Sequence, residues 1–373
     1  MMQDNKINTY QFLVLVALFT IGTSILIVPS GLAEVAKQDA WIAAILGTGI
    51  GLLVIWLFCT IGQWFPLLTF TQLIEKLLGK WIGTIVSLTF VTFSFLYATT
   101  LLAHSGTFLN IHALPNTPMV ALNILMAMIM VMGVRLGLET IARSAEILII
   151  VFLFIFVTLV VFVSPEIKFE NIQPVFESGT KTILQSSLFF VVTSSINAVI
   201  LLMIFPSFLN KRKQAKKSFL IGNLVGGIVI TIMTFLCVSV LGIDFIERQL
   251  YPSYELAKMI NIGDFVERIE ALMMTLWIIT LFFKTILYFY ASVIAMGQIL
   301  KLKDHRSLTY PLGMIAVVLS IVIYPNVIYQ QNWDSTTAVS FSLSIGLFLP
   351  LLLVIVYVGR KKQLKKENKS HEE

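Results

Sequence analysis

The sequence is poor in charged residues. Only 12% of its 373 residues are Asp, Glu, Lys or Arg, whereas 57% are hydrophobic. Soluble domains usually carry roughly 25% charged residues, so the composition excludes an ordinary soluble domain and predicts a membrane protein. No long hydrophilic insertion interrupts the chain. Residues 1–373 are therefore expected to form a single membrane domain without a separate soluble catalytic domain.

Cysteine and histidine are also scarce. Cys59 and Cys237 both fall in apolar stretches, where a free thiol behaves as a small hydrophobic group, so neither a disulfide framework nor a cysteine metal site is predicted. The four histidines are scattered, and no metalloprotease, nucleophile-elbow or P-loop motif occurs. We therefore expect no enzyme activity, no cofactor and no metal.

Apolar stretches that can cross a membrane are abundant. A helix needs about 20 residues to span the hydrocarbon core, and these stretches are continuously apolar instead of alternating, which favours helices over a barrel. We predict an all-α membrane protein with about ten transmembrane helices. The expected spans are 10–29, 41–63, 82–103, 117–134, 140–163, 183–207, 218–242, 269–299, 309–325 and 336–359.

Basic residues are distributed unevenly between the two sides of these spans. Most of the 26 Lys and Arg residues fall in alternate loops and at the chain ends, with the densest groups at 211–217 and in a basic tail, 360–373. The positive-inside rule places both termini in the cytoplasm. We interpret the basic groups as topology determinants in a lipid bilayer, not as nucleic-acid sites. The N-terminus is too polar for a cleavable signal peptide.

The ten spans divide into two halves of five, 10–163 and 182–359. Because five is odd, the halves cross the membrane in opposite senses, as inverted repeats do. The first span of each half is interrupted by small polar residues, and paired discontinuous helices of this kind frame the substrate site of such transporters. The interrupting residues are Gly22, Thr23 and Ser24 in helix 1, and Thr193, Ser194, Ser195 and Asn197 in helix 6.

The chemistry of the first interruption favours a zwitterionic ligand. Gly22 permits unusual backbone angles, and Thr23 and Ser24 are expected to cap a half-helix that starts near Ile25. Its amides would attract a carboxylate, while carbonyls near 20–21 would accept from an ammonium group. The hydroxyls of the second interruption offer the same capping chemistry. The alternative is that all these residues serve close helix packing or bond back to their own helix.

Lys284 is the ionisable residue that lies deepest within a predicted span. Intramembrane charges are costly and usually functional. Lys284 could stand where a coupling cation would sit, or it could bind a ligand carboxylate; alternatively, it reaches the interface from a misplaced span end. Thr285 and Tyr288 follow it, and Tyr288 shares its helical face. Tyr97 is a further candidate ligand-binding hydroxyl, or an interfacial anchor.

Three weaker features accompany these residues. Glu34 could line an external vestibule, although a solvated loop carboxylate is the simpler interpretation. The glycine-rich stretch 46–51 lies within a span and is interpreted as a packing face, because a nucleotide fingerprint would need a strand and an acidic residue. Arg135, Glu139 and Arg143 are spaced four apart, so a helical turn would join them in ion pairs at the cytoplasmic face.

Four segments together resemble a known family. They are Gly22-Thr23-Ser24-Ile25 followed by Pro29, Gly137-Leu138-Glu139-Thr140-Ile141-Ala142-Arg143, Leu202-Met203-Ile204-Phe205-Pro206, and Tyr254-Glu255-Leu256-Ala257-Lys258 with Ile262-Gly263-Asp264-Phe265-Val266-Glu267-Arg268. Across nearly its whole length the chain resembles the B subunits of bacterial spore germinant receptors, a branch of the amino acid–polyamine–organocation superfamily. Where many relatives carry Gly-Glu in the sixth helix, this chain has Ile196-Asn197, so the identity of the ligand stays open.

The resemblance implies both a fold and a function. The fold would be the leucine-transporter-like five-plus-five inverted repeat. The protein would be a receptor in the inner membrane of the dormant spore, working with a multi-domain A subunit and a lipoprotein C subunit. A nutrient such as an amino acid, sugar or nucleoside would trigger ion release and germination. The alternatives are a proton-coupled or facilitative amino-acid permease, with Lys284 in coupling, and a subunit of an ion-conducting pore.

Overall fold

The described part of the chain is built from helices. A computed structural model describes residues 6–259 and 269–370, with side chains as far as residue 361. Nine helical runs in these ranges are long and apolar enough to cross a membrane, and the shorter apolar helix α1 (Thr9–Ile21) precedes them. The first of the nine runs, Ser24–Trp64, contains both α2 (Ser24–Ala36) and the following helix, residues 40–64. If α1 and α2 form one interrupted span and the following helix forms the next, the described residues contain ten spans. The expectation of an all-α membrane protein with about ten spans is confirmed.

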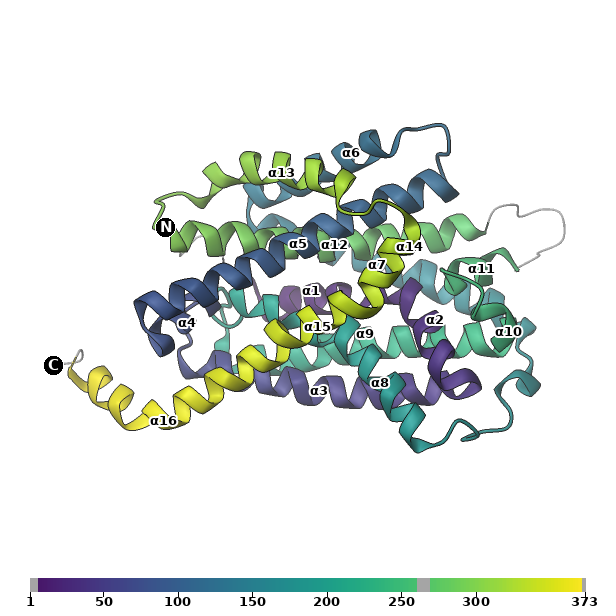
Figure 1. Cartoon of the computed structure of the whole chain (residues 1–373), viewed down its shortest axis with the longest axis horizontal. Helices are drawn as coiled ribbons and strands as arrows, with labels where there is room; N and C mark the ends of the chain where they lie inside the picture. Colours follow the sequence, from purple (N-terminus) through teal and green to yellow (C-terminus); the bar gives the residue numbers. More distant parts are fainter. Residues whose placement is uncertain (1–5, 260–268, 371–373) are drawn as a thin grey trace.

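A first helix group occupies the middle and lower part of Figure 1. Small residues allow its helices to approach closely: a Cβ added to Gly226 would lie 2.6 Å from Cβ of Thr20. Gly47 and Gly51 likewise meet side chains of the sixth span, which confirms the packing face, whereas Gly49 has open space around it. The group comprises α1, α2, α3 (Ala40–Trp64), α8 (Thr180–Ser194), η4 (Ile196–Met203) and α9 (Arg212–Leu241).

A second helix group lies above the first in Figure 1. Its helix α12 (Glu270–Ile299) is buried along most of its length and packs against both α5 and α1, so it joins the two groups. The second group comprises α5 (Lys80–His112), α6 (Met119–Leu136), α12 and α13 (Thr309–Val322).

The remaining helices cover these two groups. The last span crosses the molecule diagonally as the yellow ribbon of Figure 1 and contains two π-helical segments, η6 and η7. The elements are α4 (Phe70–Leu78), α7 (Leu138–Val163), α10 (Ile243–Ile246), α11 (Pro252–Lys258), and in the last span α14 (Val327–Asn332), η6 (Trp333–Thr337), α15 (Ala338–Leu343), η7 (Ser344–Phe348) and α16 (Leu349–Ser370). Short 3-10 turns lie at Lys37–Asp39, Ser164–Glu166, Phe169–Ile172 and His305–Leu308.

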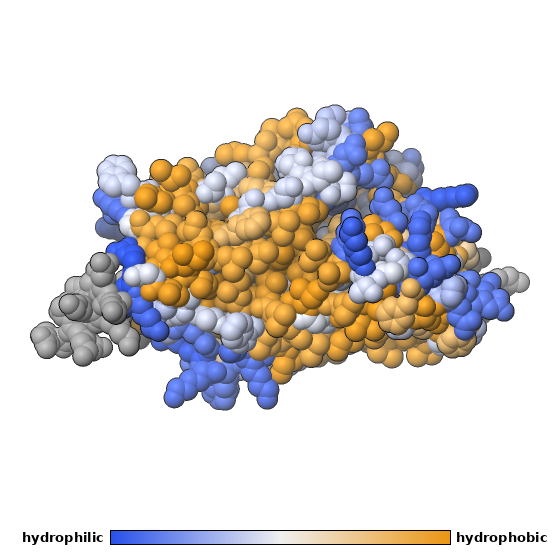
Figure 2. All heavy atoms as spheres, turned by 60° about the horizontal axis from the view of Figure 1, so that its bottom comes forward, coloured by the Kyte–Doolittle hydropathy of each residue, from blue (hydrophilic) through white to orange (hydrophobic). Residues whose placement is uncertain are grey.

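The outer surface matches a bilayer. Figure 2 shows hydrophobic residues over the middle of the molecule and hydrophilic residues gathered toward its ends. On α7, Ile147, Ile150 and Phe154 have exposed fractions of 67%, 67% and 73%. Large apolar side chains exposed in this way are expected against lipid, so the protein is a multi-pass membrane protein.

The first span is interrupted at Gly22. This residue has a φ of +32°, and its N–H donates to the Leu18 carbonyl at 2.9 Å, which closes α1. Thr23 makes no side-chain capping bond, and the Ser24 hydroxyl donates across the structure to the Thr193 carbonyl at 3.4 Å. The predicted capping by Thr23 and Ser24 is therefore wrong, because Thr23 already has helical backbone angles and the Ser24 hydroxyl faces the other interrupted span.

The second interruption is a change of helix type. The α-helix α8 ends at Ser194, and the chain continues as the tighter 3-10 helix η4 without a side-chain cap. The hydroxyls of Thr193 and Ser194 donate back to the Phe190 carbonyl, and Ser195 donates to Asn223. The predicted capping is wrong at this place too. In an apolar setting a hydroxyl finds its nearest acceptor in the carbonyl one turn earlier.

One of the two ion pairs predicted between Arg135, Glu139 and Arg143 forms. Arg143 pairs with Glu139 at 2.7 Å on α7, but the predicted pair between Arg135 and Glu139 is wrong. Gly137, with a φ of +94°, separates α6 from α7, so the two side chains do not share a helix. The Arg135 guanidinium instead lies 4.2 Å from the centroid of the Tyr310 ring.

Other expectations have mixed outcomes. Cys59 and Cys237 are buried and free, as expected. The fourth motif of the family resemblance consists of two segments. Residues 254–258 lie in α11, which packs on α2 and α12. The segment 262–268 lies outside the described residues. The repeat limits 10–163 and 182–359 stay predictions.

Replacing Gly226 with Val should destabilise the first helix group. The new side chain would overlap Thr20 on α1, and overpacking of this kind costs about 1–3 kcal/mol. The midpoint of thermal unfolding in detergent should fall. Gly49→Ala is the matched control, because nothing lies within 4 Å of its Cβ position; equal stability of both variants would contradict the packing described for α9.

Candidate functional site

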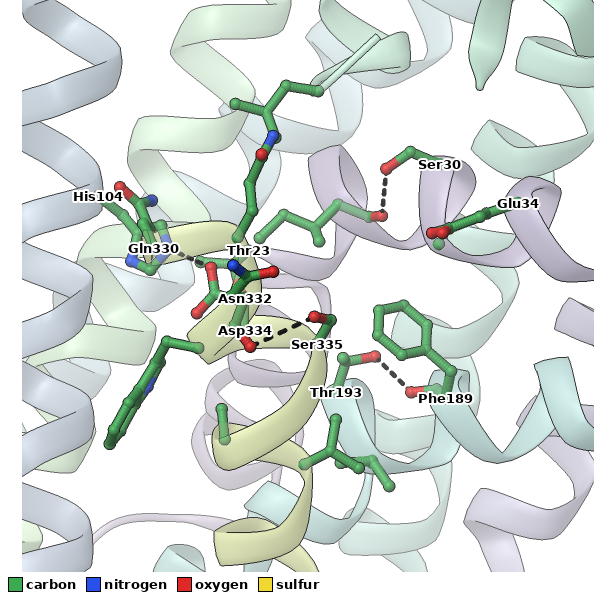
Figure 3. Close-up of a pocket in the computed structure, with 18 of the residues that line it drawn as sticks. Thr23, Ser30, Glu34, His104, Phe189, Thr193, Gln330, Asn332, Asp334 and Ser335 are labelled. Carbon is green, nitrogen blue, oxygen red and sulfur yellow. Dashed lines mark hydrogen bonds and ion pairs between the residues drawn. The ribbon is translucent and has the colours of Figure 1, made fainter. Parts of the chain in front are cut away.

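A cavity of about 670 Å³ lies where the two helix groups meet. Figure 3 shows Ser30 and Glu34 along α2 on one side, with Phe189 and Thr193 on α8 nearby. The last span brings Asp334 to the cavity, and α5 supplies a further wall. Both interrupted spans therefore contribute to one cavity.

The predicted site residues divide into two sets. Those that line the cavity are Thr23, Tyr97, Thr193, Asn197 and Lys284. Those that lie in the packed structure without lining it are Gly22, Ser24, Ser194, Ser195, Thr285 and Tyr288. The second set fits the alternative of packing and back-bonding. The Thr285 hydroxyl, for example, donates to the carbonyl of Leu281 one turn earlier.

Lys284 lies midway along α12 and is only 2% exposed. Its ammonium group donates to Thr23 Oγ1 at 3.4 Å and to the Thr193 carbonyl at 3.2 Å, so it bridges both interruptions. Within the described residues no carboxylate lies within ion-pair distance of it. An ammonium has three donors, and these two acceptors use two of them. The alternative of a misplaced span end is wrong, because half of α12 lies on each side of Lys284.

Gly22 and Lys284 depend on each other. A Cβ at Gly22 would lie 2.3 Å from Cδ of Lys284 and 2.9 Å from the Phe19 carbonyl. The Gly22 carbonyl accepts from the Thr280 hydroxyl of α12 at 2.9 Å. The absence of a side chain at Gly22 therefore gives the lysine its path to the interruption.

A chain of hydrogen bonds connects Tyr97 to the second interruption. The Tyr97 hydroxyl bonds to the Ala338 carbonyl at 2.9 Å and to the Ser342 hydroxyl at 2.5 Å. Ser342 in turn donates to Asn197 Oδ1 at 2.8 Å. Tyr97 is therefore not an interfacial anchor: it links α5, the last span and η4 beside the cavity.

Asn223 on α9 joins the two interruptions behind the cavity. Its side-chain oxygen accepts from Thr20 at 3.3 Å and from Ser195 at 3.2 Å. Thr20 lies just before the first interruption and Ser195 lies in the second. The two interruptions therefore share one buried amide as a hydrogen-bond acceptor.

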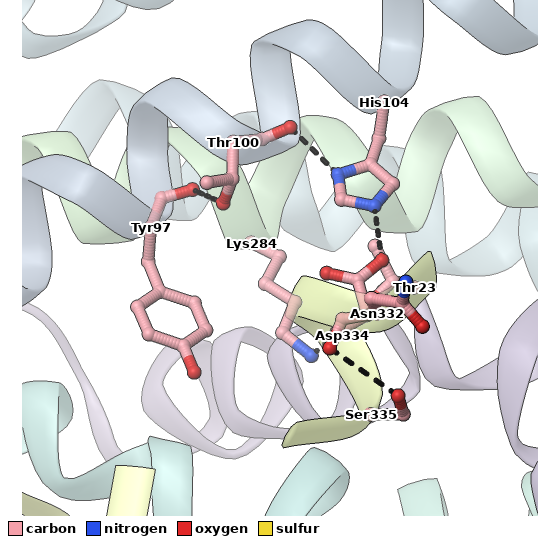
Figure 4. A network of polar contacts seen from close by, with 8 residues as sticks. All are labelled: Thr23, Tyr97, Thr100, His104, Lys284, Asn332, Asp334 and Ser335. Carbon is pink, nitrogen blue, oxygen red and sulfur yellow. Dashed lines mark hydrogen bonds and ion pairs between the residues drawn. The ribbon is translucent and has the colours of Figure 1, made fainter. Parts of the chain in front are cut away.

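The sequence reasoning missed a polar pair in the cavity. His104 Nε2 lies 2.9 Å from Asp334 Oδ2, and His104 Nδ1 lies 2.7 Å from the Thr100 carbonyl. Figure 4 shows this pair together with Lys284. The predicted third span ended at 103 and the predicted tenth began at 336, whereas α5 extends to His112 and the last span starts at Val327. The run of polar residues before the predicted tenth span was the sequence feature that could have indicated Asp334 as a site residue.

Glu34 also lines the cavity, from the exposed face of α2. The vestibule interpretation of this residue therefore fits the structure better than a solvated loop. Glu247 lies near the same opening, where it forms an ion pair with Lys37. Two acidic residues therefore line the cavity on this side, beside the basic Arg248.

Solved structures of similar fold are membrane transporters. MhsT in complex with L-phenylalanine matches with a TM-score of 0.68 at 14% identity, over 95% of this chain and 99% of that chain. Mhp1, a nucleobase-cation-symport-1 family transporter, matches with a TM-score of 0.68 at 12% identity, over 96% and 80%. The class is therefore the leucine-transporter-like five-plus-five inverted repeat with discontinuous helices 1 and 6.

Sequence comparison defines the family within that class. A family model described as "Spore germination protein" matches residues 6–328. Spore germination protein KB of Bacillus subtilis (strain 168) is 31% identical over 98% of both chains. The chain belongs to this family, the spore germinant receptor B family. Its role is that of a germinant receptor or a permease-like protein.

Replacing Asn223 with Leu should loosen both interruptions together. The variant leaves the buried hydroxyls of Thr20 and Ser195 without their acceptor, a loss of about 1–3 kcal/mol. Amide hydrogen exchange at 19–26 and 194–199 should accelerate about tenfold or more. Asn123→Leu is the control, because Asn123 donates to Ser320 within the second group; acceleration at only one interruption would contradict the link.

Proposed function

We propose that the chain is the nutrient-sensing B subunit of a spore germinant receptor. It lies in the inner membrane of the spore with both termini in the cytoplasm, and it acts with the A and C subunits. The ligand is a small solute, such as an amino acid, that enters the cavity from the outer side and binds at the interrupted helices 1 and 6. The family membership and the names of the relatives support this role.

The observation that carries the proposal is the buried ammonium group of Lys284. A buried charge in a low-dielectric interior is strongly stabilised by a partner of opposite charge. The described residues offer Lys284 two neutral oxygens and the Phe19 ring, 5.4 Å from Nζ, but no carboxylate. A ligand carboxylate would supply the missing charge. Thr23, Thr193 and Asn197 would then provide polar contacts from both interruptions.

Binding at this position would act on the contact between the two helix groups. Lys284 belongs to α12 of the second group, whereas its acceptors Thr23 and Thr193 belong to the first. A ligand shifts the balance between conformations only by its difference in affinity for them. A carboxylate that draws Lys284 away from these acceptors changes that balance. The signal then reaches the partner subunits as a helix displacement, without net transport.

A permease is the second candidate. The fold is that of transporters, and the Lys284 ammonium occupies a position beside the first interruption where a coupling cation could act. In a permease the same movement of α1, α2 and α8 against α12 would open the cavity to the cytoplasm and release the solute.

Replacing Gly22 with Val should abolish the response of spores to a nutrient mixture of amino acids and sugars. Valine cannot readily adopt a φ of +32°, and its side chain would displace Lys284. Loss of optical density during germination measures the response, and membrane fractionation verifies insertion. Gly49→Val is the control, because it faces open space. A normally inserted Gly22→Val variant that responds at normal nutrient concentrations would rule out the proposed site.

Flux separates the receptor from the permease. Vesicles that contain only the purified chain should bind radiolabelled amino acids without accumulating them in the lumen. Uptake beyond the bound amount, abolished by Gly22→Val, would establish the permease instead. Empty vesicles give the baseline for leakage.

A further inference from the structure

The His104–Asp334 pair must hold a proton. The Thr100 carbonyl oxygen can only accept a hydrogen bond, so His104 Nδ1, 2.7 Å away, carries a proton and donates it. The contact of 2.9 Å between Nε2 and Asp334 Oδ2 then requires one further proton. Either the imidazolium donates to the carboxylate, or the carboxyl donates to the neutral imidazole. Both arrangements have a net charge of zero, and Figure 4 shows the two contacts.

Asp334 is the accessible member of this pair. Its side chain is 33% exposed, whereas that of His104 is 7% exposed. Asp334 lies in the π-helical segment η6, a type of irregularity that often occurs at functional sites. His104 thus fixes Asp334 from α5, while part of the carboxylate faces the same cavity as Lys284.

We propose that Asp334, positioned by His104, binds the ammonium or other cationic group of the ligand, which displaces the shared proton. The inference rests on the proposed function, because it needs the ligand in this cavity. The ligand ammonium donates one N–H to the Asp334 carboxylate and another to His104 Nε2, so that both acceptors keep a donor. The proton of the pair passes to water, and His104 stays as neutral imidazole. The ligand carboxylate meets Lys284. The ligand class is therefore one with separate positive and negative groups, such as α-amino acids.

Several other ionisable groups face the pair or line the same cavity. Burial and the charge of Asp334 raise the pKa of Tyr251 and Tyr324 above the usual value, so both stay neutral near pH 7. Lys284 and Glu34 are tested separately by substitution. The groups are Tyr97 of α5, Lys284 of α12, Tyr251 before α11, Tyr324 before α14, Glu34 of α2, and Glu247 and Arg248 after α10.

Three probes of similar shape isolate the two ends of such a ligand. L-leucine has both charges, 3-methylbutylamine only the positive one and 4-methylpentanoate only the negative one. Binding to the full chain in lipid nanodiscs is measured by calorimetry in two buffers of different ionisation enthalpy, which counts released protons. For the native protein, leucine and the amine should release up to about one proton per ligand near pH 6, and the acid none.

The variants should have opposite effects on the probes. Asp334→Asn should weaken amine binding about tenfold or more, as expected for losing a charge-assisted hydrogen bond, and leave the acid unchanged. Lys284→Met should weaken binding of the acid and leave binding of the amine unchanged. His104→Gln should retain the amine but release no proton, because glutamine can donate to Asp334 and cannot titrate. Asp244 is an exposed residue. Asp244→Asn and Glu34→Gln should bind the three probes and release protons as the native protein does.

The inference is overturned if Asp334→Asn binds the amine normally, if Glu34→Gln carries the loss instead, or if proton release persists in His104→Gln. It is also overturned if the native protein binds neither leucine nor the amine, including the case in which it binds only D-glucose. The proposed function has a separate readout. If the native protein binds the acid or glucose and Gly22→Val does not, the proposed site at the interruptions is supported although this inference fails.

Discussion

The buried ammonium group of Lys284 is the constraint on which the rest of the site depends. It enters the interior from α12 and reaches the two interrupted spans, where neutral oxygens of Thr23 and Thr193 are its acceptors. A group of this charge is stable in an apolar interior only if polar atoms surround it. The interruptions supply those atoms, and Gly22 supplies the space. If the helices were continuous at these two places, their backbone carbonyls would already accept hydrogen bonds within the helix, and the Lys284 charge would lack acceptors.

The contacts across the cavity differ in kind from those within each helix group. Inside the groups, small residues and large apolar side chains interlock, as Gly226 does against Thr20. Across the cavity the links are polar: Lys284 to Thr193, Tyr97 to Ser342, and the His104–Asp334 pair. Packed apolar surfaces resist gradual deformation, whereas a few polar contacts can exchange partners with a ligand. A ligand that competes for these contacts would therefore act at the boundary between the two groups.

Composition and continuous apolar stretches predicted an all-α protein of about ten spans, because hydropathy directly reports which segments lie in lipid. The leucine-transporter-like fold was implied by the resemblance of four segments to a known family. Gly22 and Lys284 were recognisable as exceptions within apolar spans. The capping by Ser24 and Ser195 was mispredicted, because tertiary partners and carbonyls of the same helix compete for a hydroxyl in an apolar setting. The pair of His104 and Asp334 was missed for a related reason: a helix end that lines a polar cavity loses the apolar signal by which spans are delimited. Sequence alone does not distinguish such an end from a solvated loop.

Charge balance favours the joint use of Lys284 and the His104–Asp334 pair. Before binding, a protonated lysine and a neutral pair give these three residues a charge of +1. A zwitterion adds no net charge, so binding at Lys284 alone would leave that excess in a low-dielectric site. If the ligand ammonium takes the place of the shared proton, Lys284, the carboxylate of Asp334 and the ligand together are neutral. A purely anionic ligand reaches neutrality without releasing a proton, and an uncharged one does not reach it at all. The charge balance of these three residues therefore differs between ligand classes before shape is considered, and the number of protons released at the pair distinguishes the classes.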